Sequence, residues 1–482
     1  MGLEEIVKLG LERGFFFPSA EIYAGSPAGF WEYGHLGALL KRKFIDAWHR
    51  LMVRRDEMLL VDGSQILPKP VFVASGHLAT FADPITRCKS CKSVYRIDRL
   101  LEEKLGIKVP ERTPPEQIDE IIAEHGFRCP ACGGELDKVS LFNMMFGVSL
   151  GASGDEGYLR PETCQNIFID FPRVYKISRR KLPLALAQVG KSFRNEISPR
   201  QSLIRLREFT QAEIEVFFNP RTANEFAKAK TVADKELNMW VGERVEKITC
   251  ERAVESGLVS SWLVAYYLWL VQDFYFRLGI GSDRLRFRRL GDDEKAFYAA
   301  EAWDLEVLTS TGWVELVACN NRTDYDLGGH QRVSGVDLRV TEDGESFLPH
   351  VFELSMGVDR SLLALLEHGY VQENGRSVLR LHPALAPYTI AVFPLLDRPE
   401  LTQVAQQLYN KLQLDFDTFY DEKGSIGRRY RRQDEIGTPF CITVDYQTLE
   451  DNTVTVRDRD TMKQERVNIE VLKSYISDKL VI

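Results

Sequence analysis

Long apolar segments are missing from this sequence of 482 residues. No stretch reaches the roughly eighteen uninterrupted apolar residues that a membrane-spanning helix needs. The most apolar run, residues 260–276, contains Gln272 and Asp273 and predicts a buried amphipathic helix. Residues 1–13 are charged and lack the apolar centre of a secretory signal. We therefore expect a cytoplasmic protein without membrane contact.

An excess of positive charge is also missing. The chain has 62 lysines and arginines against 70 aspartates and glutamates, which gives a net charge of −8. General attraction to nucleic acid is thereby excluded, and any contact with RNA phosphates must use local patches. The hydrophobic fraction of 44% and the charged fraction of 27% are ordinary for a globular protein. The length suggests about three domains.

Cysteine is scarce, with eight residues, but four of them form two Cys-x-x-Cys pairs. The pairs, Cys88/Cys91 and Cys129/Cys132, are separated by 37 residues. Two such turns can bring four thiolates around a tetrahedral zinc ion, which would be structural because no position stays open for water. Two unrelated pairs or a redox motif are the alternatives. The other four cysteines are expected in the core.

Cations, a phenylalanine and carboxylates gather in one hairpin. Its two arms read Phe193-Arg194-Asn195-Glu196 and Arg205-Leu206-Arg207-Glu208-Phe209. Apolar runs at 182–189 and 214–218 predict antiparallel strands, joined by a turn at 198–200. Arg194 can hold a phosphate as a planar fork, and a purine can lie between Phe209 and Arg360. The pattern indicates a nucleotide site, with a charged surface hairpin as the alternative.

This hairpin resembles motif 2 of the class II aminoacyl-tRNA synthetases. Its amino-acid sequence, up to Glu213-Ile214-Glu215, is similar to that of the glycyl-tRNA synthetases. The resemblance implies a catalytic sheet that binds glycine and ATP with Mg²⁺, and catalytic roles for Arg194, Glu315 and Arg360. It assigns ATP to Arg194, Asn195, Glu196, Ile204, Arg205, Leu206, Arg207, Glu208, Phe209, Glu315, Leu316, Gly357, Val358, Asp359 and Arg360. It assigns glycine to Arg96, Glu162, Phe209, Thr210, Gln211, Ala212, Glu213, Arg322, Glu353, Ser355 and Gly357.

Three further segments carry the resemblance. In Arg160-Pro161-Glu162-Thr163, it implies that Glu162 takes the ammonium group of glycine; a helix cap is the alternative. In the strand-like segment 312–327, Glu315 would help hold Mg²⁺ and Arg322 would bind the glycine carboxylate.

The third segment, residues 349–360, resembles motif 3, a strand that feeds a helix. Here Arg360 would contact the γ-phosphate and stack on adenine, while Glu353 and Ser355 would line the amino-acid pocket. Gly357 would let the backbone approach the nucleotide. We expect Glu162, Glu353 and Ser355 to exclude alanine by crowding the Cα position, since one methyl group is worth only about 1–3 kcal/mol of discrimination.

Several positions depart from the pattern of the family, namely Cys164, Asn166, Ala318, Leu354 and Met356. We expect the last two to support the pocket rather than change its chemistry. Arg96 matches an arginine that helps enclose the substrate in the family, although Arg99 stands where a histidine would follow.

Residues 29–37 and the helix predicted at 38–54 resemble motif 1, which builds the dimer interface in the family. The resemblance favours a homodimer, with an ordinary core helix as the alternative.

The tail, from about residue 386, alternates strand and helix patterns and resembles the anticodon-binding domain of these enzymes. One helix presents a basic run that offers phosphate attraction and a stacking face: Arg428, Arg429, Tyr430, Arg431 and Arg432. A solvated helix face is the alternative.

We expect an α+β fold: a class II synthetase core with zinc-ribbon-like and helical insertions, followed by an α/β anticodon-binding domain. The predicted divisions are a core at 1–84, 138–219 and 282–385, a zinc insertion at 85–137, a helical insertion at 220–281, and the anticodon domain at 386–482. The predicted function is attachment of glycine to its tRNA through glycyl-adenylate. The alternatives are a threonyl or prolyl synthetase, or an inactive synthetase-like nucleic-acid-binding or regulatory subunit.

Overall fold

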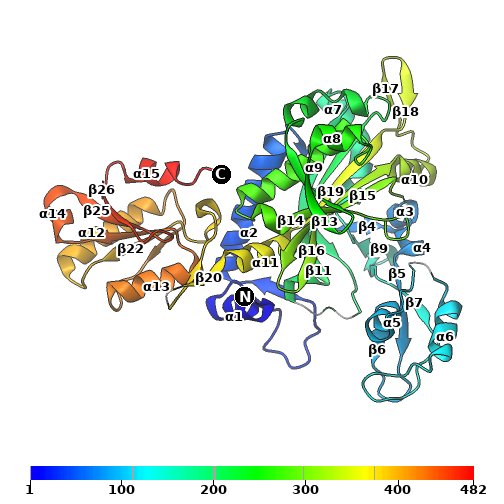
Figure 1. Ribbon diagram of the computed structural model, residues 1–482, viewed down its shortest axis with the longest axis horizontal. Helices are drawn as coiled ribbons and strands as arrows, with labels where there is room; N and C mark the ends of the chain where they lie inside the picture. The colour runs from blue at the N-terminus through cyan, green and yellow to red at the C-terminus, as the bar shows by residue number, and fades with distance from the viewer. Residues whose placement is uncertain (1, 111–112, 198, 200–201, 297, 374) are drawn as a thin grey trace.

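The structure, a computed structural model, describes residues 2–110, 113–197, 199, 202–296, 298–373 and 375–482. Figure 1 shows a large core, a smaller body that ends the chain, and a small unit that contains β5 (Ala82–Arg87) and β7 (Ser140–Asn143). Within these ranges, no helix is both long and apolar enough to cross a membrane. The turn predicted at 198–200 lies largely outside the described residues.

A nine-stranded sheet forms the centre of the core, in the order β13-β12-β14-β15-β16-β19-β11-β10-β3. In chain order its strands are β3 (Leu59–Leu60), β10 (Leu184–Phe193), β11 (Glu208–Phe218), β12 (Glu236–Val241), β13 (Arg244–Thr249), β14 (Leu285–Arg289), β15 (Glu301–Thr309), β16 (Gly312–Thr323) and β19 (His350–Gly357). Neighbours are antiparallel except β10 with β3 and β12 with β14. The predicted antiparallel core is confirmed.

Alternate residues of β11 face two different layers. Ile214 and Val216 share a hydrophobic cluster with α2 (His35–Trp48), α9 (Trp262–Arg277) and α11 (Val358–Gly369). Phe217 instead stacks on Phe171 of α7 (Cys164–Ser178), with ring centroids 3.9 Å apart. Because successive strand side chains point to opposite faces, Glu213 and Glu215 lie on the α7 face. The pocket described below is on that face.

Shorter elements complete the core. They are α1 (Leu3–Arg13), β1 (Phe16–Pro18), β2 (Trp31–Tyr33), β4 (Ile66–Pro68), α3 (Lys69–Ala74), α4 (His77–Thr80), β8 (Phe146–Leu150), β9 (Asp155–Leu159), α8 (Cys250–Glu255), α10 (Tyr325–Ser334), β17 (Val340–Glu342), β18 (Glu345–Phe347), β20 (Tyr370–Glu373) and β21 (Arg376–Leu379). Helix α2 continues as a π-helical turn, His49–Arg54, so the helix predicted at 38–54 is confirmed. The strand-to-helix passage predicted at 349–360 is also confirmed by β19 and α11.

The prediction of a wholly helical segment at 220–281 is wrong. Helices α8 and α9 are present, but β12 and β13 precede them in the chain and extend the central sheet. Gly242 joins these strands with a φ of +63°, a conformation that glycine adopts without strain. Leu237 and Met239 alternate into the core. This period-two pattern outweighs the helical propensity of the surrounding alanine, lysine and glutamate.

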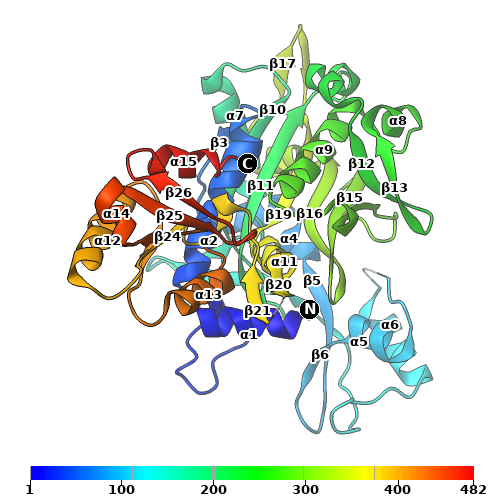
Figure 2. The same cartoon turned by 60° about the vertical axis from the view of Figure 1, so that its left-hand side comes forward.

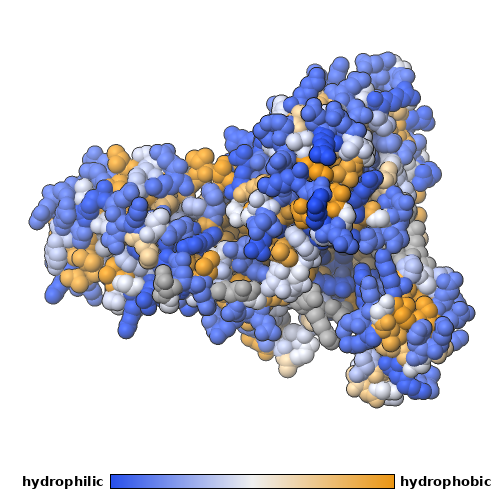
Figure 3. All heavy atoms as spheres, viewed as in Figure 1, coloured by the Kyte–Doolittle hydropathy of each residue, from blue (hydrophilic) through white to orange (hydrophobic). Residues whose placement is uncertain are grey.

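The small unit has a three-stranded sheet in the order β6-β5-β7 and two helices. Its remaining elements are β6 (Val94–Arg96), α5 (Ile97–Leu105) and α6 (Pro115–Glu124). Ile97, Leu101, Ile118 and Val139 form its own hydrophobic cluster. The space-filling view in Figure 3 shows a largely hydrophilic face, with hydrophobic residues gathered over this unit and over the middle of the core.

The C-terminal body has a five-stranded sheet in the order β23-β22-β24-β25-β26. Its elements are β22 (Ile390–Pro394), α12 (Pro399–Leu412), β23 (Thr418–Tyr420), α13 (Ile426–Ile436), β24 (Phe440–Val444), α14 (Tyr446–Asp451), β25 (Thr453–Asp458), β26 (Gln464–Asn468) and α15 (Leu472–Asp478). The predicted α/β arrangement is confirmed. Figures 1 and 2 place this body beside α2, where Arg42 and Lys43 pair with Asp417 at 2.6 and 3.2 Å.

Candidate active site

A hollow of about 240 Å³ lies where one end of β10 and β11 meets β16 and β19. The lining residues come from all the predicted motifs except motif 1: Glu162, Arg194, Glu196, Leu203, Ile204, Arg205, Leu206, Phe209, Thr210, Gln211, Tyr298, Glu315, Ala318, Asn320, Glu353, Ser355, Gly357, Asp359 and Arg360. Segments that are far apart in the sequence therefore share one cavity. Their binding roles remain predictions.

One end of the hollow is lined by half-exposed cations. The Arg194 guanidinium lies over the Phe209 ring, 5.3 Å from its centroid, and its Nε donates to the Pro161 carbonyl at 3.1 Å. Arg360 donates from Nε to the Ile204 carbonyl at 3.0 Å and pairs with Glu315 at 3.3 Å. The side chains of Arg360 and Glu315 are 34% and 43% exposed. Both guanidiniums are anchored through Nε, and Arg360 Nη1 also contacts Glu315; because both arginines line the hollow, their other N–H groups could serve an anionic ligand.

A carboxylate that the sequence did not point to lies beside Glu315. Burial, and then the charge of Glu315, raise the pKa of Asp304 to about 7, while Arg288 and Arg360 oppose the shift. A divalent cation placed between neighbouring carboxylates would relieve their mutual repulsion, so Asp304 and Glu315 are candidate ligands for one.

The opposite end of the hollow is buried and acidic. Arg322, a predicted glycine ligand, lies behind this end and not in its lining; it is only 1% exposed and donates to Glu353 at 2.8 Å and to Asp326 at 2.7 and 2.9 Å. Its guanidinium lies 4.1 Å from the centre of the Tyr298 ring. Burial raises the pKa of Glu353 to about 7, although Arg322 lowers it. Glu353 therefore sits close to its titration point at neutral pH.

Glu162 carries the most stable negative charge at this end. Burial alone would raise its pKa, but the charges of His77 and Arg322, with hydrogen bonds, hold the pKa well below its usual range. Its Oε1 accepts from Gln165 Nε2 and Cys164 Sγ, each at 2.9 Å. It does not cap α7, whose N-cap residue is Thr163. A buried and permanently charged carboxylate is suited to an ammonium group.

Glu213 lies beneath this end of the hollow. It accepts hydrogen bonds from Ser355 Oγ at 2.7 Å, Gln211 Nε2 at 3.0 Å and Thr163 Oγ1 at 2.5 Å. Burial raises the pKa values of Glu213 and its neighbour Glu215. Ser355 and Gln211 are thus held in place by hydrogen bonds to the buried carboxylate of Glu213.

Comparisons with known proteins cover nearly the whole chain. Residues 149–369 match the family "tRNA synthetase class II core domain (G, H, P, S and T)", and residues 389–479 match "Anticodon binding domain". The glycine–tRNA ligase of Methanothrix thermoacetophila is 39% identical over an alignment that covers 98% of this chain and 96% of the relative. Those of Pyrococcus furiosus and Methanocaldococcus jannaschii are 40% and 38% identical, with 97% and 99% of this chain and 97% and 99% of the relatives covered. The chain belongs to the glycine–tRNA ligase family.

Some residues that the family resemblance assigned to ATP do not line the hollow. The side chains of Leu316 and Val358 are buried in the core, and neither residue lines the hollow. Arg207 donates to the carbonyls of Glu196 and Ala28, each at 2.9 Å. Two more also lie outside the lining: Asn195 and Glu208. Glu208 pairs with Lys191 at 3.0 Å.

Asp359 lines the hollow, but both of its carboxylate oxygens already accept hydrogen bonds from other residues. Its Oδ1 accepts from Tyr33 at 2.5 Å and its Oδ2 accepts from the Thr210 backbone N–H at 2.6 Å. Lys41, from α2, donates to Thr210 Oγ1 at 2.5 Å. Asp359 therefore ties the motif 1 segment to the floor of the pocket rather than offering a free carboxylate to ATP.

Two residues assigned to glycine lie elsewhere. Ala212 faces the hydrophobic core on the opposite side of β11. Arg96 pairs with Asp83 and Asp98, each at 3.0 Å, in the small unit. The assignment of these side chains to the glycine pocket is contradicted, because strand alternation and ion pairing direct them away from it.

His77 is a site residue that the sequence reasoning missed. Its Nε2 lies 3.4 Å from Glu162 Oε1, and its Nδ1 shares a hydrogen bond of 2.7 Å with Ser75 Oγ. The rings of Phe72 and Phe81 pack edge-on against it at 6.2 and 5.4 Å. It lies on the four-residue helix α4, where no periodic pattern indicates its direction.

Departures from the family pattern have structural accounts. Leu354 and Met356 are buried on the core face of β19, and their effect on the pocket remains a prediction. Cys164 donates to Glu162, and Asn166 accepts from Arg160 Nη1 at 3.1 Å. Ala318 lines the hollow with its small side chain.

The two cysteine pairs converge in the small unit. The Cys88 and Cys132 sulfurs are 3.5 Å apart, the Cys91 and Cys129 sulfurs are 3.6 Å apart, and all four lie within 4.8 Å of one another. Four sulfurs this close suit one tetrahedral metal ion. The other cysteines of the chain are buried, as expected.

The basic run of α13 does not form one surface. Arg429 is 1% exposed and donates to the carbonyls of Pro394 and Leu395 at 2.6 and 3.1 Å. Tyr430 is half-buried and its hydroxyl shares a hydrogen bond with Thr443. The prediction that Arg429 contacts RNA is wrong, because helical periodicity turns it into the core. Three of the predicted residues are exposed: Arg428, Arg431 and Arg432.

Proposed function

We propose that this protein activates glycine with ATP and then transfers the glycyl group to tRNA. The glycine carboxylate attacks the α-phosphorus in line, which forms glycyl-adenylate and releases pyrophosphate. A terminal hydroxyl of tRNA then attacks the glycyl carbonyl and AMP leaves. One observation carries the proposal: this chain, a member of the glycine–tRNA ligase family, has one hollow with a cationic and aromatic end and a buried acidic end.

Arg194 and Arg360 would hold the phosphates, and Phe209 would hold adenine. Because the guanidiniums are anchored before ATP arrives, they can stabilise charge on the transferring phosphoryl group without rearrangement. Glu315, with Asp304 beside it, would hold Mg²⁺ of the substrate complex, which neutralises the phosphate charge. No side chain has to act as a nucleophile.

Glu162 and Glu353 would hold the glycine ammonium group, with Ser355 as a third contact. Arg322 would attract the glycine carboxylate and would have to give up one of its bonds to Glu353, Asp326 or Tyr298 to contact it directly. These groups would crowd the Cα of bound glycine, so alanine would be excluded by steric contact.

Cys88, Cys91, Cys129 and Cys132 would hold a structural Zn²⁺ that closes the small unit. Metal analysis of purified protein tests this. One zinc per chain in the wild type and none in Cys88→Ser, with an unchanged amount in Cys250→Ser, is the expected result. Equal zinc in all three proteins would contradict it.

The homodimer, built on α2 and β1–β2, remains a proposal, as do a cytoplasmic location and tRNA contact through Arg428, Arg431 and Arg432. Measurement of the molecular mass in solution tests the homodimer. To test the tRNA contact, each exposed arginine can be replaced in turn and tRNA binding measured, with replacement of the buried Arg429 as the control.

Glycine-dependent exchange between ATP and pyrophosphate, followed by charging of tRNA, tests the function. Exchange with glycine and none with threonine or proline is expected. Exchange with threonine or proline would support the rival synthetases, and absence of exchange with every amino acid would support the inactive regulatory subunit.

A further inference from the structure

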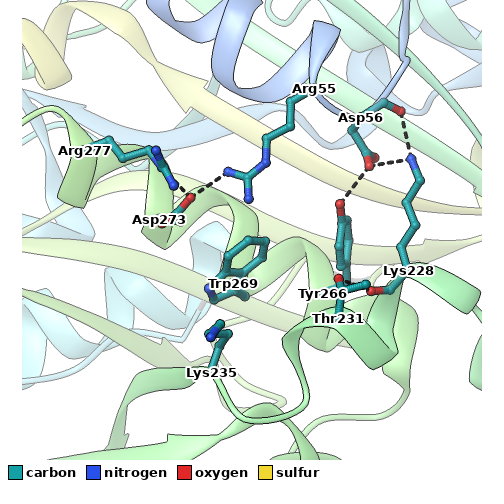
Figure 4. A pocket seen from close by; sticks show the side chains of 9 residues that line it. All are labelled: Arg55, Asp56, Lys228, Thr231, Lys235, Tyr266, Trp269, Asp273 and Arg277. Carbon is teal, nitrogen blue, oxygen red and sulfur yellow. Dashed lines mark hydrogen bonds and ion pairs between the residues drawn. The ribbon is translucent and has the colours of Figure 1, made fainter. Parts of the chain in front are cut away.

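A second hollow lies on the core, far from the active site. Its volume is about 480 Å³ and its lining is Arg55, Asp56, Lys228, Thr231, Lys235, Tyr266, Trp269, Asp273 and Arg277. Figure 4 shows these side chains turned toward a common space around Trp269. Arg55 and Asp56 directly follow the π-helical turn after α2, Lys228 and Thr231 lie on a 3₁₀ helix at Ala227–Val232, Lys235 directly precedes β12, and the rest lie on α9. None of them lines the active-site hollow.

The distance between the two sites follows from the sheet. Lys228 and Asp56 also line a neighbouring hollow that includes Leu184, the first residue of β10. Arg194 follows the last residue of the same strand. A strand rises about 3.3 Å per residue, so the two ends are about 30 Å apart. The second hollow is therefore separate from the ATP and glycine sites.

Positive charge exceeds negative charge in this hollow, with four cationic and two anionic side chains among the nine that line it. One of the anions is fully engaged. Asp56, whose side chain is 2% exposed, accepts from Lys228 at 2.6 Å, Tyr266 at 2.8 Å and Tyr267 at 3.0 Å. Asp56 thus fixes Lys228 and has little capacity to repel a second anion.

The other anion organises two guanidiniums. Arg55 Nη1 and Arg277 Nε both donate to the same oxygen, Asp273 Oδ2, at 2.7 Å. Each guanidinium keeps further N–H groups, and Arg55 is braced on Trp269 with 4.9 Å between its Cζ and the ring centre. Two guanidiniums that share one carboxylate oxygen leave a net positive charge and several donors close together. This geometry suits the tetrahedral oxygens of a phosphate group.

Lys235 stands across the Trp269 ring from Arg55 in Figure 4 and pairs with Asp234 at the protein surface. Through Lys228 the hollow also continues into a groove whose lining includes further cations: Lys176, Arg179, Arg180 and Lys181. On a protein with a net charge of −8, such a run of cations is a local exception.

We propose that the hollow around Trp269 binds a phosphate group, with Arg55, Arg277, Lys228 and Lys235 as its ligands. A free phosphate compound and the phosphodiester backbone of RNA are two sources of the same chemistry. The continuing groove provides the additional cations that an RNA backbone would need.

The test uses the full chain with its active site saturated by a non-hydrolysable glycyl-adenylate analogue, so that only other sites report. Wild type is compared with Arg277→Gln/Lys235→Gln and with the control Lys230→Gln. Lys230 is exposed on the same 3₁₀ helix as Lys228 and does not line the hollow. Inorganic phosphate is titrated by ³¹P NMR, and a non-cognate single-stranded RNA is titrated at three salt concentrations.

At least about tenfold weaker phosphate binding in the double variant, with the control unchanged, supports a free phosphate compound as the source. If the double variant binds only RNA more weakly, the site is assigned to an RNA backbone. The slope of log affinity against log salt concentration should then be shallower by about 1–2 than in wild type. Equal affinities of all three proteins for both ligands would overturn the proposal. Lys235→Glu, a single change at an exposed residue, repeats the test if the double variant unfolds at a lower temperature than wild type.

Discussion

The two ends of the active-site hollow differ in how firmly their charges are held. At the amino-acid end, Arg322 and Glu353 are buried and locked in short ion pairs. At the nucleotide end, Arg360 and Glu315 are a third or more exposed and share one longer pair. A rigid end can reject an extra methyl group by contact, because its side chains have nowhere to move. An open end can exchange protein ion pairs for phosphate and metal contacts.

This difference predicts that damage to the two ends has different kinetic signatures. Changes at the nucleotide end should reduce the rate of the chemical step, whereas changes at the amino-acid end should chiefly raise the KM for glycine. The first three predictions below test this separation, and the fourth tests the proton at the nucleotide end.

The largest effect is expected from Arg194→Ala. Loss of a pre-positioned guanidinium from the α-phosphate should reduce glycine-dependent pyrophosphate exchange by about 10³-fold or more. Thermal unfolding should stay near that of wild type, since Arg194 makes a single hydrogen bond to Pro161. Arg207→Ala, from the same hairpin but outside the hollow, is the matched control. Exchange at the wild-type rate in Arg194→Ala would refute the assigned role.

Glu162→Gln should raise the KM for glycine by about 100-fold, because a charge-assisted hydrogen bond to the ammonium group becomes a neutral one. The KM for ATP should change little, which steady-state exchange measured against each substrate will check. If both KM values rise equally, the two ends are not independent.

His77→Ala should raise the KM for glycine by about tenfold, because Glu162 loses a partner at 3.4 Å that holds its charge and position. His77→Gln, which keeps a donor near the same place, should recover part of the loss. An unchanged KM in His77→Ala would show that Gln165 and Arg322 alone position Glu162.

The smallest effect concerns pH. Asp304 has a pKa raised to about 7. Between about pH 4 and pH 7 the folded protein keeps a proton that the unfolded chain has lost, so stability from this group falls as the pH rises through that window. Asp304→Asn should therefore reduce the drop in thermal midpoint between pH 5 and pH 8 by about 2 °C. An identical drop in wild type and variant would place the proton elsewhere.

Much of this pocket was accessible from the sequence because its residues lie in contiguous motifs with strand periodicity. Arg194, Phe209, Glu353 and Arg360 were placed in one site from such segments, and they share one hollow. Predictions failed where a whole segment was assigned to a site without asking which of its side chains face that site. Arg429 and Ala212 lie in the right segments, but helix and strand geometry turn them into the core.

Other features could not be predicted because they arise from tertiary packing. His77 approaches Glu162 from a short helix with no pattern of its own. Asp304 acquires its raised pKa only when β15 and β16 pair, which buries it beside Glu315. The strands β12 and β13 were missed because residues of good helical propensity surround a short alternating pattern.

A crystal structure of the protein with a non-hydrolysable glycyl-adenylate analogue tests the two-ended pocket most directly. The account predicts the ammonium group against Glu162 and Glu353, and adenine between Phe209 and Arg360. An analogue bound with its amino group among the arginines, or with adenine away from both side chains, would contradict it.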